Sequence, residues 1–108
     1  MASNRPRVKV PRSASKGEVV EIKTLISHEM ETGQRRDDQG NRIPQNIIHA
    51  FKCSYNGQTV FEADMTSAIS ANPYFVFYVK AVESGELEFV WTEDGGNTFS
   101  TKETIEVS

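Results

Sequence analysis

Residues 47–65, IIHAFKCSYNGQTVFEADM, decide the fold. Apolar side chains recur at every second position on both sides of Asn56-Gly57, and a period of two is typical of half-buried β-strands. Asn-Gly is a strong hairpin signal, because both residues accept a positive φ and a primed turn matches the twist of paired strands. The sequence therefore predicts that Ile47–Tyr55 and Val60–Met65 pair antiparallel. The residues expected to face the core are Ile47, Phe51, Cys53, Tyr55, Phe61, Ala63 and Met65.

The same alternation continues on both sides of this hairpin. It predicts five further strands, at Arg7–Arg12, Glu18–Ser27, Tyr74–Ala81, Glu86–Thr92 and Thr98–Val107, with turns between them that include Ser13–Gly17. Pro6 and Pro11 lack N–H donors, so the first strand is expected at a sheet edge. Seven short strands without a helix predict an all-β, immunoglobulin-like β-sandwich of about seven antiparallel strands. Residues 7–108 would form this single domain after a short N-terminal tail, residues 1–6.

Length and charge exclude several classes of protein. The 108 residues suit one domain, and no stretch has the roughly 20 apolar residues of a membrane-spanning helix. Five bases lie in the first sixteen residues, but the net charge of −3 speaks against nucleic acid as a partner, because phosphate binding needs a basic footprint. The region after residue 82 is acidic, with seven carboxylates and Lys102 as its one cation.

Two segments are candidates for contact with a partner. From His28 to Asn46 the alternation is lost and the chain reads as a long polar loop, either a contact region or a solvated excursion. Tyr74–Ala81 is apolar on both faces, with Phe75, Phe77 and Val79 on one and Tyr74, Val76 and Tyr78 on the other. Such a strand needs cover on two sides, from a core together with either a partner or the chain's own loops.

The residue types that carry chemistry do not combine into a catalytic or metal site. Cys53 is the one cysteine, which excludes an internal disulfide and a Cys-rich zinc site. His49 and Cys53 share a strand face but lie about 13 Å apart along it, too far to bind one ion. His28, Met30 and Met65 do not complete a copper-type spacing. The residues thus predict a binding or scaffold domain without cofactor or metal, and not an enzyme.

Three longer stretches carry a resemblance to a known family. RVKVPRSASKGEVVEIKTLISHEMETG at residues 7–33, FKCSYNGQTVFEADM at 51–65 and ISANPYFVFYVKAVESGELEFVWTEDGG at 69–96 closely resemble SoxZ. SoxZ proteins are the small subunits of the SoxYZ carrier of bacterial sulfur oxidation. The resemblance covers nearly the whole chain.

The resemblance implies a non-catalytic subunit that binds SoxY in the periplasm. In SoxY-type subunits a C-terminal Gly-Gly-Cys-Gly-Gly arm carries the sulfur intermediate, whereas this chain ends in Ile105-Glu106-Val107-Ser108, so the carrier thiol is expected on the partner. The first sixteen residues lack the apolar segment of a signal peptide, so export together with SoxY is expected. The alternative is a stand-alone metal- or thiol-dependent enzyme on the same sandwich.

Two contact surfaces follow as hypotheses. The residues expected to contact SoxY are His28, Met30, Asn72, Pro73, Tyr74, Val76 and Tyr78. The acidic C-terminal third, including Glu86, Glu88 and Glu93, would make transient electrostatic contacts with other Sox pathway enzymes.

Overall fold

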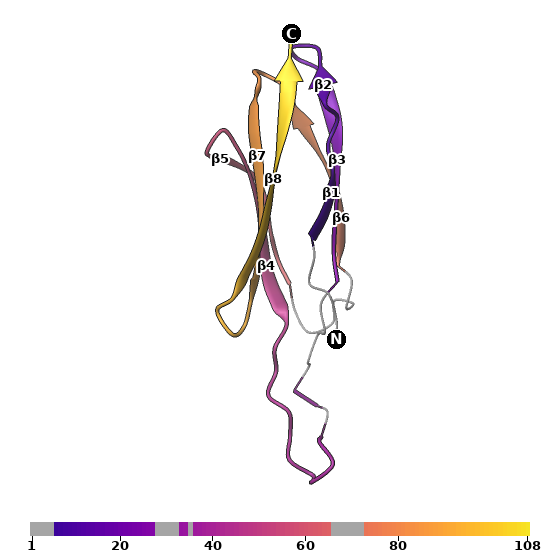
Figure 1. Cartoon of the computed structure of the whole chain (residues 1–108), viewed down its shortest axis with the longest axis vertical. Coiled ribbons are helices and arrows are strands. Elements are labelled where there is room, and N and C mark those ends of the chain that lie inside the picture. The colour runs from indigo at the N-terminus through magenta and orange to yellow at the C-terminus, as the bar shows by residue number, and fades with distance from the viewer. Residues whose placement is uncertain (1–5, 28–32, 35, 66–72) are drawn as a thin grey trace.

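Eight β-strands make up the regular structure of the part of the chain that the computed structural model describes, residues 6–27, 33–34, 36–65 and 73–108 (Figure 1). The strands are β1 (Pro6–Lys9), β2 (Ser13–Ala14), β3 (Val19–Ile26), β4 (Ile48–Tyr55), β5 (Gln58–Asp64), β6 (Tyr74–Lys80), β7 (Gly85–Glu93) and β8 (Thr98–Val107). In these residues no helix is long and apolar enough to cross a membrane.

The strands form two sheets that face each other. One sheet has the order β1-β3-β6 and the other β2-β8-β7-β4-β5, and Figure 1 shows them as two layers. The chain passes from the first sheet to the second between β1 and β2, so one side of the sandwich is closed by the chain itself. This arrangement has the two packed sheets that the immunoglobulin-like prediction requires. The all-β sandwich is confirmed.

Two details of the prediction were wrong. β2 lies inside the predicted turn Ser13–Gly17, and it pairs parallel with β8 through Ser13–Glu106 and Ala14–Val107. The first strand ends at Lys9 and not at Arg12. Pro11 cannot donate to a ladder, and after it the chain has already left the first sheet for the second.

The burial pattern follows the period of two. In β3 the side chains of Val20, Ile22, Thr24 and Ile26 are buried, and in β7 those of Leu87, Phe89 and Trp91. Thr24 is the polar member of this core, and its hydroxyl donates a hydrogen bond of 3.4 Å to the carbonyl of Phe75. The core residues predicted for the strand at Ile47–Tyr55 are buried as well, namely Ile47, Phe51, Cys53 and Tyr55, so that prediction is confirmed.

An aromatic cluster joins the two sheets. The ring of Phe51 in β4 stacks on Phe75 of β6 with centroids 5.2 Å apart, and it lies 4.9 Å from Trp91 of β7. Phe61 of β5 stacks on Phe77 of β6 at 4.4 Å. Aromatic pairs in such geometries contribute roughly 0.5–1.5 kcal/mol beyond the burial of their area. The inner face of β6 is therefore held firmly against the five-stranded sheet.

The predicted β4–β5 hairpin is confirmed, and its turn is hydrogen-bonded to the start of β7. Asn56 and Gly57 both have positive φ, 50° and 83°. The Asn56 side-chain oxygen accepts a hydrogen bond of 2.9 Å from the Glu86 N–H, and the Asn56 N–H donates to the Glu86 carbonyl at 2.9 Å. A Cβ at Gly85 would lie 1.9 Å from the Asn56 side-chain oxygen. Position 85 therefore requires glycine because of the space that Asn56 occupies.

The opposite end of the sandwich anchors the long polar segment. Residues 36–47 extend beyond the sheets (Figure 1), and their last residues fold against the β7–β8 turn. The Asp94 carboxylate accepts hydrogen bonds from Gln45 Nε2 at 2.9 Å and from the Ile47 N–H at 3.3 Å. Glu93 accepts a 2.6 Å hydrogen bond from Asn97 Nδ2 and is buried. Glu93 therefore does not belong to an exposed docking surface, and that part of the electrostatic hypothesis was wrong.

The two glycines that begin and follow β7 give a matched stability test. We expect Gly85→Ala to lower the free energy of unfolding by about 1–3 kcal/mol, because the new methyl group displaces Asn56 and breaks its bond to the Glu86 N–H. Gly95→Ala is the control, since its nearest neighbour is 3.4 Å away, and it should change stability by less than about 0.5 kcal/mol. Urea denaturation of both variants measures this. Equal losses would contradict the role given to Asn56.

Candidate functional site

The outer face of β6 is an exposed apolar strip. Tyr74, Val76 and Tyr78 are 54%, 42% and 62% exposed, whereas Phe77 and Val79, which alternate with them, are buried. Large apolar side chains scattered singly on a surface need no explanation, but three on one face of one strand form a continuous patch. We call these three residues the β6 strip.

Basic side chains border the strip on the same sheet. The strand register places Lys23 beside Val76 and Leu25 beside Tyr74, and Arg7 lies on the other side of Leu25. Arg7, Lys9, Lys23 and Leu25 line, together with Tyr74, a shallow hollow of about 240 Å³. The outer face of β1, β3 and β6 thus combines apolar and cationic groups, although the chain as a whole is acidic.

Glu21 is the acidic group on this face. Its carboxylate accepts a hydrogen bond of 3.3 Å from the Tyr78 hydroxyl and forms an ion pair of 3.4 Å with Lys23. All three side chains are exposed, so these contacts contribute little to stability. Their effect is to hold the Tyr78 ring across the sheet surface.

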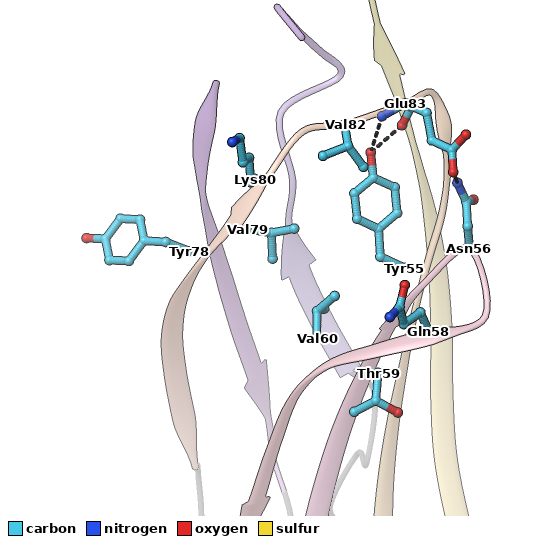
Figure 2. Close-up of a pocket in the computed structure, with 10 residues that line it drawn as sticks. All are labelled: Tyr55, Asn56, Gln58, Thr59, Val60, Tyr78, Val79, Lys80, Val82 and Glu83. Carbon is cyan, nitrogen blue, oxygen red and sulfur yellow. Dashed lines mark hydrogen bonds between the residues drawn. The ribbon is translucent and has the colours of Figure 1, made fainter. Parts of the chain in front are cut away.

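A groove of about 430 Å³ lies next to the strip, on the open side of the sandwich. In Figure 2, Tyr55, Val60 and Val79 point into this groove, whereas Tyr78 points away from it toward the outer face. The Tyr55 hydroxyl donates to the Glu83 carbonyl and accepts a 3.2 Å hydrogen bond from the Glu83 N–H. This pair of bonds fixes the upper end of the groove.

The sequence-predicted contact residues separate into three groups. The three residues of the β6 strip come together on one exposed face. Pro73 is buried directly before β6, so it offers little surface of its own. His28, Met30 and Asn72 lie outside the described residues. The contact with SoxY itself stays a prediction for all seven.

Sequence reasoning missed the surroundings of the strip. Val60 and Val82 are 40% and 47% exposed beside the groove, and Leu25 is half-buried next to Tyr74. Val19 and Leu25 lie on the outer face of β3, where they alternate with its buried residues. Which strand lies beside β6 depends on topology, and the sequence pattern carries no signal for that.

The lone thiol is shielded. Cys53 is fully buried in β4, between the neighbours Phe61 and Phe89 on the adjacent strands. Burial raises the pKa of this thiol to about 12. Because the thiolate is the nucleophilic form, Cys53 is a poor nucleophile in the folded protein. The described residues also contain no group of three or more His, Cys, Asp or Glu that could hold a metal ion.

Thiol reactivity gives a direct test. At about pH 8 the folded protein should react with a thiol reagent at least roughly a hundredfold more slowly than the protein unfolded in guanidinium chloride, since both the thiolate fraction and the access are lower. Absorbance of the released chromophore from a disulfide reagent measures both rates. A native rate close to the unfolded rate would show that Cys53 is accessible and would restore a thiol-dependent activity as a candidate.

Comparison with known proteins decides the family. A sequence model of the family described as Sulphur oxidation protein SoxZ matches residues 8–104. The chain belongs to the SoxZ family. The resemblance noted in the sequence is thereby confirmed over nearly the whole chain. No curated protein sequence matches it.

Solved structures share the fold of this SoxZ-family chain. A superoxide reductase (neelaredoxin) from Ignicoccus hospitalis superposes with a TM-score of 0.78 at 12% identity, covering 99% of this chain and 83% of the other. The sulfur carrier protein SoxY from Chlorobium limicola f thiosulfatophilum gives 0.68 at 15% identity, with 98% and 81% covered. A putative superoxide reductase from Thermotoga maritima gives 0.71 at 15% identity, with 98% and 88% covered. At these identities the likeness shows the fold alone.

Proposed function

We propose that this chain is the non-catalytic subunit of a SoxYZ-type carrier in sulfur oxidation. It would bind SoxY through the β6 strip and the basic face around it, and would hold SoxY so that its cysteine-bearing arm reaches the other Sox enzymes. The observation that carries this proposal is the SoxZ family match together with an exposed apolar strip on a rigid strand. A complex located in the periplasm, with the export signal on SoxY, is part of the same proposal.

The physical requirements of such a subunit agree with the structure. A stable interface buries roughly 800 Å² on each partner and is enriched in tyrosine at its centre. The β6 strip supplies two tyrosines on a strand whose inner face is stacked against the aromatic cluster. The one thiol of the chain is buried and protonated, which leaves the covalent chemistry of the cargo to the partner.

A stand-alone enzyme is the second candidate, because two of the structural relatives are superoxide reductases. Metal analysis of the purified protein separates the two. A stoichiometric bound metal would favour the enzyme, whereas metal-free protein that still binds SoxY favours the carrier subunit.

Contacts with further Sox enzymes remain a proposal for the five-stranded sheet. Glu86 and Glu88 are both near Lys102, at 3.7 and 3.9 Å, and point to its solvent face. Such contacts would be weakened by salt, since exposed charges are screened.

Copurification with SoxY tests the proposed interface. We expect Tyr78→Glu to weaken the complex at least roughly tenfold, because it removes an apolar ring and places a second carboxylate beside Glu21. Coexpression with tagged SoxY, followed by quantification of the bound chain, measures the effect.

Thr104→Glu is the matched control, since it adds the same charge at an exposed position of β8 on the other sheet. It should leave the complex intact, and circular dichroism should show that both variants are folded. Undiminished binding of the folded Tyr78→Glu variant would remove the β6 strip from the interface.

A further inference from the structure

β6 is a sheet edge. Among the described residues it pairs with β3 alone, in a register that runs without interruption from Val19–Lys80 to Leu25–Tyr74. Just beyond this ladder the Ala81 N–H donates to the Glu18 carbonyl at 2.8 Å, and the Ala81 carbonyl accepts from the Gly17 N–H at 2.6 Å, so both backbone groups of Ala81 face the β3 side. Hydrogen-bonded and non-bonded pairs alternate along an antiparallel ladder. The N–H and C=O groups of Tyr74, Val76, Tyr78 and Lys80 therefore point to the open edge.

The edge of β6 lacks the features that protect sheet edges from association. Proteins guard such edges with proline, inward bends, bulges, short strands and charges. β6 has seven residues, no proline, no register shift and a single charge, at its end. It is long enough, at roughly 23 Å, to bind another strand along its whole length.

The other edge strands in the described part of the chain are protected. β5 has a register shift opposite Cys53 and Ser54, and it carries Glu62 and Asp64. β1 has four residues and begins with Pro6. β2 has two residues. The contrast singles out β6 as the edge that is kept available for pairing.

We propose that an edge strand of SoxY adds antiparallel to β6, so that the three-stranded sheet continues into the partner. This inference rests on the proposed function and specifies how that interface is built. SoxY has the same fold and its structure covers 98% of this chain, so it includes a counterpart of β6. Two such edges can pair around an approximate twofold axis, as in isologous interfaces.

Charge argues against a second copy of this chain as the partner. The outer face of β1, β3 and β6 carries the cations Arg7, Lys9, Lys23 and Lys80 against the single carboxylate of Glu21. Joining two copies edge to edge would place two cationic faces in one continuous surface. A partner whose added strand is apolar opposite Val76 and acidic opposite Lys80 satisfies this face, because opposite charges across strands stabilise and like charges destabilise.

Amide hydrogen exchange in the coexpressed complex tests the proposal without any substitution. In the free chain the amides of Val76, Tyr78 and Lys80 should exchange rapidly, and in the complex they should slow by at least roughly tenfold, because each gains a hydrogen bond. The edge amides of Glu62 and Asp64 in β5 should not change.

Proline substitution provides the second measurement. Val76→Pro removes an edge N–H without removing a bond to β3, and it should weaken SoxY binding roughly tenfold or more. Glu62→Pro makes the same change on the β5 edge, where the Met65 N–H bond of 2.8 Å to the His49 carbonyl sets the alternation, and it should bind like the wild type.

The outcomes separate the two levels of the proposal. Failure of the wild-type chain to bind SoxY would overturn the proposed function. Binding with unprotected β6 amides, or with equal effects of the two proline variants, would overturn strand addition while the carrier role stands. A stable homodimer that protects the same amides and is not displaced by SoxY would show that a second copy is the occupant.

Discussion

The stacking of Phe51 and Phe61 on the aromatic side chains of β6 is the interaction on which the rest of the molecule depends. In the described part of the chain the β6 strand pairs with β3 alone, so its position depends mainly on the side chains packed beneath it. Phe75 and Phe77 provide that support through rings 5.2 and 4.4 Å from their partners in the other sheet. Because these side chains are rigid, the outer face of β6 presents its apolar groups in one geometry before any partner arrives.

The one thiol of the chain is kept away from the surface that a partner could contact. Cys53 lies within this core, where burial keeps its thiol protonated, and the exposed surface is left with tyrosine, valine, lysine and carboxylate side chains. Of these, tyrosine is common in protein–protein contacts. In the proposed carrier complex this separation would keep the sulfur of Cys53 from competing for the oxidised cargo.

The alternation of apolar and polar residues was sufficient to predict most strands, because successive side chains of a strand point in turn to the core and to solvent. It predicted the β4–β5 hairpin from Asn56-Gly57 and identified the two-faced character of Tyr74–Lys80. It could not predict β2, whose two residues are too few to show a period. It could not predict the burial of Glu93 either, because Glu93 is covered by the segment around Asn46, which is distant in the sequence. The open edge of β6 is a property of strand order, which no single segment encodes.

In the proposed complex, the passage of the chain from one sheet to the other between β1 and β2 would limit how large the assembly can grow. That crossing seals one seam of the sandwich, and β5 is guarded by its bulge and carboxylates, so just one described strand remains open to addition. A protein with one open edge strand can pair with one further strand. Strand addition at one open edge would therefore join two chains and would not extend into a fibre.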